Sequence, residues 1–533
     1  MKSLKLFFLA IACFIAMAAT AQQPQSKGQM NSQKLATTLY LIENFYVDTA
    51  NIDKVTEDAI IAALKELDPH SAYISKKDVE KANEPLVGSF EGIGVTYQLI
   101  RDTITVISPT AGGPSEKVGI MTGDQIIKID GEDAFGKKID NDYVQKRLRG
   151  KKGTKVTVGV KRGSDPELID FEITRDKIPL NSINASYMLD NHIGYIKLDR
   201  FAQESTQEFK EAFAKLQSQG MESLIFDLRG NTGGYLNTAI ELVDQFIDEG
   251  KLIVFTEGIH SPRQEWRSTA AGLYTTGKLV VLIDEGSASA SEILSGAIQD
   301  HDRGVVIGRR SFGKGLVQRP FNLPDGAQIR LTTSRYHTPS GRCIQRPYEK
   351  GAEDYAKEME KRLKHGEYYH ADSIHFPDSL KFKTDSGRTV YGGGGIMPDL
   401  FIPVDTAYNS QLYTNLVRKG ALNRFTTDYA LKHRDEIKAQ YGDFDNYNKN
   451  FVVGQDLIKG LKKAAEDAKV EWNDEQFNRS EKFLLLQIKA LIARNVWETQ
   501  QYYQVMASSD PGVQKAIEIL NDNKAFNKIL SNK

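Results

Sequence analysis

One stretch of the chain, VLIDEGSASASEILSGAIQDHDRGVVIGRRSFGKGLVQ at residues 281–318, constrains the fold more than any other. An apolar run ends in a Gly-Ser turn, a short amphipathic helix follows, and a second apolar run leads to a glycine-flanked lysine. Strand, helix and strand in this order are typical of an α/β sheet. The same order presents a serine at a helix N-terminus and can bring a lysine to it. A serine whose proton is taken by a neutral lysine is a hydrolase nucleophile.

Strand and helix patterns alternate on both sides of this stretch, from residue 177 to 404. This alternation predicts a parallel or mixed sheet with helices on its faces. Within the region, residues 348–386 are charged and rich in His and Tyr, so we expect a surface insertion there. The predicted elements are strands at His192–Asp199, Ser223–Leu228, Lys278–Asp284 and Gly304–Gly308, and a helix with one apolar stripe at Tyr235–Asp248.

The rest of the 533-residue chain divides into regions of different pattern, so we expect a multidomain protein. Residues 86–176 contain short β-type runs separated by glycine turns, which indicate a compact β-rich domain. Residues 34–85 and 405–533 have apolar side chains at helical spacing, and we expect the second of these regions to serve packing or oligomerisation. Residues 22–33 are polar and predict a flexible segment.

The N-terminus has the pattern of a signal peptide. Two lysines precede an apolar run that ends in the small-x-small sequence ATA at residues 19–21. We expect cleavage before Gln22 and export to the periplasm or cell envelope, with an uncleaved N-terminal anchor as the alternative. Cys13 lies in the middle of the apolar run, which argues against a lipoprotein.

Charge and cysteine usage exclude several kinds of partner. The net charge of −1 gives no basic excess, so we expect no nucleic-acid partner. Cleavage would leave Cys343 as the only cysteine, which excludes an intrachain disulfide and a cysteine-based metal site. A serine–lysine mechanism needs no metal and no cofactor, and we expect none.

Three serines alternate at the start of the predicted helix, at Ser287, Ser289 and Ser291. Ser289 and Glu292 match a capping box, so a purely structural role as a helix cap is the alternative for this serine. A serine in this position also leaves the next backbone N–H, that of Ala290, unpaired. Such a donor can stabilise a developing oxyanion.

Lys314 lies between two glycines, just past a predicted strand. A solvated loop lysine is the alternative, because lysine acts as a general base only where burial lowers its pKa by several units from about 10.4. The flanking glycines allow the backbone to approach closely, and Phe312 and Leu316 could supply apolar walls. Gln318 could orient the lysine amine by a hydrogen bond.

A second glycine-rich turn, FDLRGNTGG at residues 226–234, ends one predicted strand and opens the predicted helix that follows. In open α/β sheets the ligand site lies at this edge, and a helix N-terminus there is a natural anion site. The N–H of Gly233 or Gly234 could therefore be a second oxyanion donor. A plain strand–helix turn is the alternative.

Two other motifs overlap the lysine without a full match. Residues 308–314 match most of a P-loop, but Gly315 stands where Ser or Thr should hold magnesium. Ser311 and Lys314 match Ser-x-x-Lys, yet the companion motifs Ser-Asp-Asn and Lys-Thr-Gly do not occur in the chain. A Ser-His hydrolase stays open as a third reading. Its candidate histidines are His192, His260, His301 and His337.

Taken together, these motifs resemble the carboxy-terminal processing proteases (tail-specific proteases), which are S41-type serine peptidases with a PDZ domain. The resemblance rests on GSASASEI, FGKGLVQ, DLRGNTGG, YHTPSGRCIQ, GGGIMPD and LDPHSAYI, and it covers roughly residues 35–404. It implies a multidomain α/β fold. A crotonase/ClpP-like protease core at 177–404 would carry an inserted β-rich PDZ domain at 86–176 and helical N- and C-terminal regions.

The resemblance also implies roles for individual residues. PDZ domains hold a peptide's C-terminal carboxylate on loop amides, although the four-residue loop string alone would be read as a β-turn. The implied catalytic residues are Ser289 (nucleophile), Lys314 (general base), Gln318 (orienting the lysine), Ala290 with Gly233 or Gly234 (oxyanion donors), and Glu292 and Asp300 (supporting). The implied PDZ residues are Gly92, Ile93, Gly94 and Val95 (carboxylate loop) and Arg149 (coupling to the active site).

The expected function is a serine endopeptidase that cleaves exported proteins, recognised by their apolar C-terminal tails through the PDZ domain. An activating adaptor protein and a homo-oligomer are compatible with this function. A non-catalytic PDZ adaptor on a protease-like scaffold and a Ser-His hydrolase are the alternatives.

Overall fold

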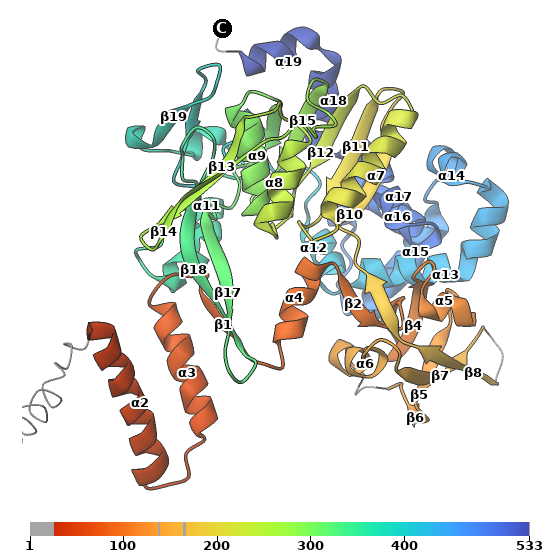
Figure 1. Ribbon diagram of the computed structural model, residues 1–533. Coiled ribbons are helices and arrows are strands. Elements are labelled where there is room, and N and C mark those ends of the chain that lie inside the picture. Colours follow the sequence, from red (N-terminus) through yellow and green to blue (C-terminus); the bar gives the residue numbers. More distant parts are fainter. Residues whose placement is uncertain (1–25, 137–138, 164–166, 532–533) are drawn as a thin grey trace, which may run out of the picture.

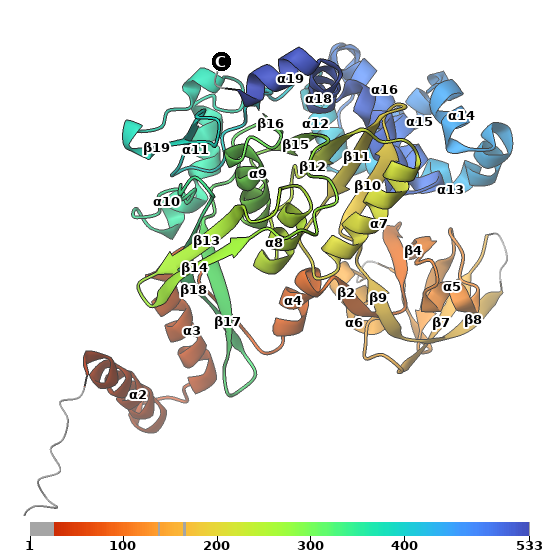
Figure 2. The same ribbon diagram turned by 45° about the horizontal axis from the view of Figure 1, so that its top comes forward.

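The computed structural model describes residues 26–136, 139–163 and 167–531. The predicted signal peptide at 1–21 lies outside these residues. Figures 1 and 2 show a mixed α/β body with a β-rich domain at one end, a projecting arm of N-terminal helices, and C-terminal helices around the far side. Among the described residues, no helix is both long enough and apolar enough to cross a membrane.

A six-stranded sheet forms the centre of the body, in the order β10-β11-β12-β15-β16-β21. The strands from β11 onward are parallel, and β10 pairs antiparallel with β11 at one edge. All four predicted strands of this region form, with ends that differ from the prediction by one residue at most. The strands are β10 (Ile183–Met188), β11 (Ile193–Leu198), β12 (Ser223–Asp227), β15 (Lys278–Ile283), β16 (Val305–Gly308) and β21 (Leu400–Phe401).

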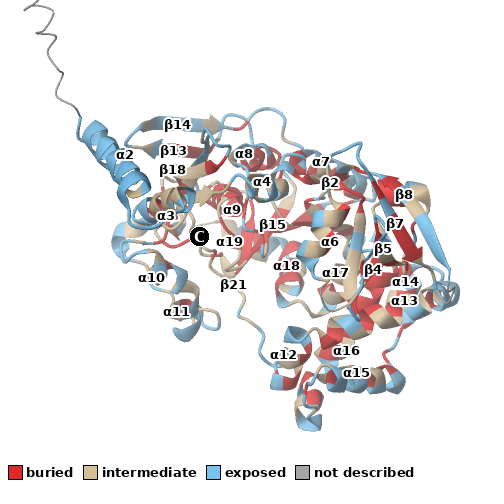
Figure 3. Ribbon diagram, turned by 90° about the horizontal axis from the view of Figure 1, so that it is seen from below, coloured by how far each residue is buried: buried red, intermediate tan, exposed pale blue. Residues whose placement is uncertain are grey.

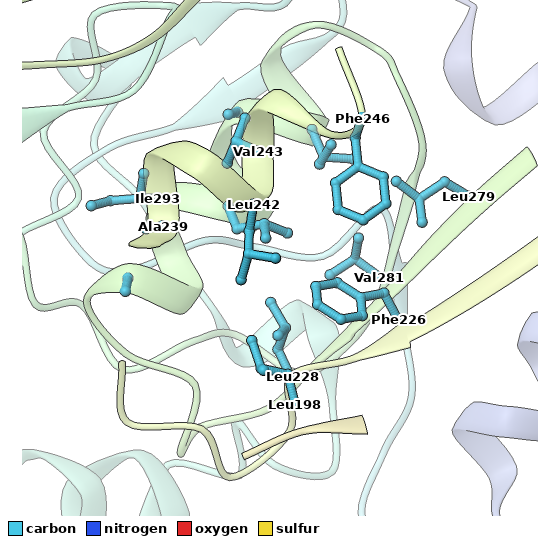
Figure 4. Close-up of a cluster of buried hydrophobic side chains, with 14 of the residues drawn as sticks. Leu198, Phe226, Leu228, Ala239, Leu242, Val243, Phe246, Leu279, Val281 and Ile293 are labelled. Carbon is cyan, nitrogen blue, oxygen red and sulfur yellow. The ribbon is translucent and has the colours of Figure 1, made fainter. Parts of the chain in front are cut away.

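Helices cover both faces of this sheet, which explains why its strands are apolar on both sides. On one face, Leu242 of a covering helix and Phe246, just past the end of that helix, pack on Phe226 and Val281 of the strands (Figure 4). On the other face, the last helices of the chain bury Val513 and neighbouring side chains against the strands. The first face carries α7 (Ser205–Ser218), α8 (Leu236–Asp244) and α9 (Ala290–Asp300), and the second carries α17 (Thr499–Met506), η3 (Ala507–Ser509), α18 (Pro511–Asn521) and α19 (Asn523–Leu530).

A second sheet has the order β1-β18-β13-β14, with β17 paired to β18. The β17–β18 hairpin follows Lys314 directly, so this sheet positions the segment that carries the lysine. Its first strand comes from the N-terminal region, far away in sequence. The strands are β1 (Ala72–Ile74), β13 (Leu252–Gly258), β14 (Ser261–Arg267), β17 (Leu316–Asn322) and β18 (Gln328–His337).

The β-rich region forms a small domain with its own core of buried Ile and Val side chains. Its main sheet has the order β3-β4-β5-β7-β8, with β6 beside β5, and a separate ribbon pairs β2 with β9. Its elements are β2 (Ser89–Gly92), β3 (Val95–Ile100), β4 (Thr103–Pro109), α5 (Pro114–Val118), β5 (Gln125–Ile129), β6 (Glu132–Asp133), α6 (Asn141–Leu148), β7 (Lys155–Lys161), β8 (Leu168–Thr174) and β9 (Asp176–Pro179).

The N-terminal region is helical from an earlier point than the sequence predicts. Segment 22–33 is expected to be flexible, but a helix begins at Lys27 because Ser26 and Gln29 form a capping box. This helix has no buried residue and is coloured as exposed over most of its length in Figure 3. The helices are α2 (Lys27–Phe45), α3 (Ile52–Lys65) and α4 (Val79–Val87).

The C-terminal region is helical, as predicted, and most of it shares one core of its own. Only its last helices, from α17 on, pack on the central sheet. The region therefore has two parts, one of which completes the α/β body. The helices of the first part are α12 (Gln411–Arg418), α13 (Ala421–Tyr441), α14 (Phe444–Asn450), α15 (Gln455–Asp467) and α16 (Asp474–Val496).

Segment 348–386, expected to be a surface insertion, also reaches into the body. Tyr355 and Arg362 are buried, and the Arg362 guanidinium donates to the carbonyl oxygens of Ser311 and Phe312. The segment therefore supports the loop that leads to the candidate lysine. Its elements and the strand that follows are α10 (Ala352–Ala356), α11 (Glu358–Lys364), η1 (Ala371–Ser373), η2 (Asp378–Leu380), β19 (Lys381–Lys383) and β20 (Thr389–Tyr391).

Candidate active site

The structure distinguishes Ser289 from its two neighbours. Ser287 and Ser291 are fully buried, and their hydroxyls donate to the carbonyl oxygens of Leu228 and Asn231 at 2.8 Å each. Ser289 is only partly buried and lines a cavity of about 930 Å³. The flanking serines therefore pin the turn that presents the middle serine to the cavity.

Ser289 has an unusual backbone conformation, with φ 55° and ψ −111°. A non-glycine residue in this region is strained, and such strain persists only where the surroundings hold it. Here the Ser289 N–H donates to Glu292 Oε2 at 2.8 Å, and the Tyr336 hydroxyl donates to the Ser289 carbonyl oxygen at 3.1 Å. Hydrogen bonds therefore fix both the N–H and the carbonyl group of Ser289 in the turn between β15 and α9.

Glu292 joins the serine turn to the lysine loop. Its side chain is fully buried, and its carboxylate accepts from the Ser311 hydroxyl and from the backbone N–H groups of Ser289, Gly313 and Lys314. Burial raises the pKa of the Glu292 carboxyl, and the four donors oppose that rise. The supporting role expected for Glu292 therefore has a geometric basis.

Lys314 lines the same cavity as Ser289. Burial lowers the pKa of its ammonium from 10.5, and the positive charge of Arg330 lowers it further, while Glu292 and Asp68 act in the opposite direction. In the part of the chain that the structure describes, the Lys314 ammonium makes no hydrogen bond or ion pair. A lysine in this state is closer to neutrality than a solvated loop lysine.

Gln318 lies on β17 and also lines this cavity. Its side-chain Nε2 donates to Thr332 Oγ1 on the adjacent strand at 3.1 Å. The structure therefore places Ser289, Lys314 and Gln318 on the wall of one cavity, as the resemblance implies.

The glycine turn between β12 and α8 faces the serine. A Cβ built on Gly233 would lie 2.9 Å from Ser289 Cβ and 2.9 Å from the Ala290 nitrogen, so only glycine fits there, at φ 99°. The Gly233 N–H donates to Asn231 Oδ1 at 2.8 Å. Among the described residues, the N–H groups of Ala290 and Gly234 donate to no partner, and both residues line the cavity.

Asn231 is a site residue whose role the sequence did not predict. Its side-chain Nδ2 donates to the Leu198 carbonyl oxygen. Its backbone carbonyl oxygen accepts from Ser291 Oγ and from the Ala288 N–H. It therefore joins the glycine turn to the serine turn. The signal was present, since Asn231 lies inside the DLRGNTGG motif, but its sequence alone does not indicate these long-range partners.

The histidines of the Ser-His alternative lie elsewhere. No histidine lines the cavity beside Ser289 within the described residues. His301 contacts Leu252 and Asp385, and His192 contacts Asn521. His337 Nδ1 donates to the Gly341 carbonyl oxygen at 3.0 Å, and the His337 ring stacks on that of Phe255. The geometry therefore favours a lysine over a histidine as the base.

Three family models match parts of the chain. Residues 192–353 match the model of peptidase family S41, residues 92–173 match that of the PDZ domain, and residues 412–498 match a family of unknown function (DUF8443). The carboxy-terminal processing protease CtpB of Bacillus subtilis (strain 168) is 32% identical over 369 residues, which cover 69% of this chain and 74% of CtpB. The chain belongs to the carboxy-terminal processing proteases of family S41.

The chain is also similar to a second curated protease and to a solved protease structure. A probable CtpA-like serine protease of Staphylococcus aureus (strain MRSA252) is 36% identical over 318 residues, 59% of this chain. The match spans 63% of that relative's length. The solved structure of a photosystem II D1 C-terminal processing protease has 27% identity and a TM-score of 0.34, and covers 58% of this chain and 89% of its own. The two family models, matched at residues 192–353 and 92–173, show that the fold is an S41 protease core with a PDZ domain.

In this S41 protein the predicted carboxylate loop of the PDZ domain links β2 to β3. Gly92 ends β2, Ile93 is buried with its carbonyl oxygen accepting from Ser115, and Gly94 has φ 72° before Val95 begins β3. Strand β3 is at the edge of the domain's main sheet. The loop therefore precedes an unpaired strand edge, which is the arrangement that a peptide strand can extend.

Arg149 and Asp300 lie in different surroundings. The Arg149 guanidinium donates to both carboxylate oxygens of Glu84 on α4, at 2.8 and 2.6 Å, and lies over the Phe90 ring. Helix α4 also contributes Leu86 to the cavity wall, so this contact joins the PDZ domain to the site. Asp300 is the last residue of α9, at the opposite end of that helix from Ser289, where it forms a buried ion pair with Arg342 at 2.7 Å.

Proposed function

We propose that this chain is a serine endopeptidase in which Ser289 is the nucleophile and Lys314 is the general base. The observation that carries this proposal is the shared support of the two residues. Both line one cavity, and both donate a backbone N–H to Glu292 Oε2. A single buried carboxylate therefore fixes the spacing of nucleophile and base.

In the proposed reaction, neutral Lys314 accepts the proton of the Ser289 hydroxyl as Oγ attacks the scissile carbonyl carbon. The tetrahedral intermediate collapses to an acyl-enzyme, and the Lys314 ammonium gives its proton to the leaving amine. Water then attacks the acyl carbon as Lys314 accepts one of its protons, and the second intermediate collapses to release the acid as the Lys314 ammonium returns that proton to Ser289 Oγ. Burial of Lys314 supports this role, because it lowers the pKa of the ammonium.

The oxyanion of each intermediate would accept from two backbone N–H groups. Ala290 and Gly234 are the donors we propose, because both line the cavity and neither N–H has a partner in the described residues. Gly233 is the less suitable of the two glycines, since its N–H already donates to Asn231. Fixed donors of this kind stabilise developing negative charge without reorganisation.

We further propose that substrates are exported proteins that the PDZ domain recognises by apolar C-terminal tails. The loop from Gly92 to Val95 would hold the carboxylate, and the tail would add as a strand beside β3. Apolar side chains such as Leu86, Ile293 and Leu316 line the catalytic cavity and suit apolar substrate residues. Export rests on the signal-peptide pattern of the sequence.

The test of this function is cleavage of an unfolded protein that ends in apolar residues. The unmutated chain should cleave it, and Ser289→Ala and Lys314→Ala should each be folded and inactive. A second substrate with a charged, amidated tail tests recognition through the PDZ domain and should be cleaved more slowly. Full turnover by either variant would refute the serine–lysine pair, and an inactive parent would favour the non-catalytic adaptor.

A further inference from the structure

We propose that Thr332 and Asp68 are positioning residues that fix the direction of the Gln318 side-chain amide, so that its carbonyl oxygen faces Lys314. The proposal rests on the proposed function of Gln318 and Lys314. It adds two residues, one of them from the N-terminal region, that act on the base through Gln318.

The observation is a chain of side-chain hydrogen bonds that begins at the cavity wall. Gln318 Nε2 donates to Thr332 Oγ1 at 3.1 Å, and Thr332 Oγ1 donates to Asp68 Oδ1 at 3.1 Å. The Thr332 N–H also donates to Ser71 Oγ at 3.1 Å. Gln318 is thereby linked to a carboxylate that lies outside the cavity.

Three paired strands bring these residues together. In the β17–β18 hairpin, Gln318 and Thr332 are direct cross-strand partners. Strand β1 pairs with the other side of β18, with Ala72 opposite Arg330, which holds the preceding Asp68 segment beside Thr332. The hydrogen bonds therefore cross one sheet, and strand pairing fixes the backbone positions of Gln318 and Thr332.

The last acceptor, Asp68, determines which group donates in each of these hydrogen bonds. The Asp68 carboxylate accepts from the backbone N–H groups of His70 and Ser71 and from Ser71 Oγ. Although burial acts to raise the pKa of Asp68, these donors hold it below the usual value, so the group is ionised at neutral pH. An ionised carboxylate only accepts hydrogen bonds, and the Thr332 hydroxyl must therefore donate to it.

A hydroxyl that donates its one proton to Asp68 can only accept from Gln318. The Gln318 amide must then turn its NH₂ group toward Thr332, which leaves its carbonyl oxygen for another donor. We assign Lys314 as that donor, because both residues line the cavity and the Lys314 nitrogen makes no hydrogen bond within the described residues. A carbonyl that accepts one N–H of the neutral amine leaves the nitrogen lone pair free to accept the serine proton.

Four single variants of the full chain test this hydrogen-bond relay, which runs from Asp68 through Thr332 to Gln318. Thr332→Val removes the hydroxyl and keeps the branched shape, and Thr332→Ser keeps the hydroxyl. Asp68→Asn replaces a pure acceptor with an amide that can also donate, which allows the relay to reverse. Thr333→Val is the matched control, because Thr333 Oγ1 is buried on the same strand and has no hydrogen-bond partner among the described residues.

The readouts are kcat and KM for peptide cleavage, the rate at which a fluorophosphonate labels Ser289, and Tm. We expect Thr332→Val and Asp68→Asn to lower kcat and the labelling rate by about ten- to a hundredfold with KM little changed. Thr332→Ser should restore both rates to within about threefold, and Thr333→Val should match the parent. A merely structural role would lower Tm and raise KM without this separation.

The results separate failure of the relay from failure of the proposed function. If the parent neither cleaves nor is labelled at Ser289, the proposed function is wrong and the relay falls with it. If the parent is active and Thr332→Val has the same kcat and labelling rate as Thr333→Val, the relay alone is refuted. The relay is also refuted if Thr332→Ser has a kcat and a labelling rate as low as those of Thr332→Val.

Discussion

The backbone N–H groups of Ser289 and Lys314 donate to one carboxylate oxygen, Oε2 of Glu292, at 2.8 and 2.9 Å. Nucleophile and base come from different segments of the chain, one at the start of α9 and the other before β17. Their common acceptor makes the distance between them a property of one buried side chain. Glu292 is therefore the residue on which the geometry of the site depends most.

Glu292→Gln should damage both stability and activity. The amide presents two N–H donors to a pocket whose four partners are all donors, so at least one buried N–H or hydroxyl loses its acceptor. We expect the free energy of unfolding to fall by about 3 kcal/mol. Denaturant unfolding measures this change, with Ser289→Ala as a control that should stay close to the parent. Equal stability of parent and Glu292→Gln would contradict the account.

The pH dependence of activity should report the Lys314 pKa. Because Lys314 must be neutral to accept a proton, kcat/KM should rise with pH through its pKa. Arg330 is one of the groups that lower this pKa, so Arg330→Met should raise it and shift the rising limb to higher pH. Arg330→Lys keeps the positive charge and should leave the limb near its original position. A limb that does not move in Arg330→Met would argue against Lys314 as the titrating base.

Gly233→Ala should abolish activity. A Cβ at this position meets the Ala288 carbonyl oxygen at 2.7 Å and the Ala290 nitrogen at 2.9 Å, which forces the glycine and serine turns apart. Gly230→Ala is the matched control, because Gly230 also has positive φ, 72°, but a Cβ there has no neighbour within 4 Å. We expect activity only in the control, measured as peptide cleavage. An active Gly233→Ala enzyme would show that close contact of the two turns is unnecessary.

The C-terminal region should stabilise the glycine turn through one ion pair. Arg229, at the start of the turn, pairs with Asp227 of β12 and with Asp510, which also caps α18. Asp510→Asn removes the charge but keeps a good helix cap, so its effect isolates the ion pair. We expect a loss of about 1 kcal/mol of stability and a lower kcat.

Asp522→Asn is the control for this variant, because Asp522 caps α19 in the same manner and forms no ion pair within the described residues. Its kcat should equal that of the parent, and its free energy of unfolding should fall by no more than a few tenths of a kcal/mol. Identical kcat values for Asp510→Asn and Asp522→Asn would refute a role of the C-terminal region in the catalytic turn.

Local sequence predicted the centre of the fold well. The strands and the helix around Ser289 are continuous apolar runs closed by glycine turns, and such runs have few alternative structures. The predicted helix at Tyr235–Asp248 forms as α8 from Leu236 to Asp244. The resemblance to the S41 motifs assigned Ser289, Lys314 and Gln318 to one site, and all three residues line one cavity.

What sequence did not predict depends on contacts between distant segments. Nothing local indicates that α18 covers the sheet, that Arg362 supports the Lys314 loop, or that Asp68 contacts Thr332. The helix at Lys27 was missed because a polar segment with a capping box reads as a flexible end when apolar periodicity is the only criterion.

The most direct test of the central claim is labelling of the full chain with a fluorophosphonate, which bonds to an activated serine oxygen as fluoride leaves. Mass spectrometry of the digested protein identifies the modified residue. The account predicts modification at Ser289 in the parent, and none in Lys314→Ala when that variant has the parent's Tm. Undiminished labelling of Ser289 in Lys314→Ala, or labelling of another serine, would contradict it.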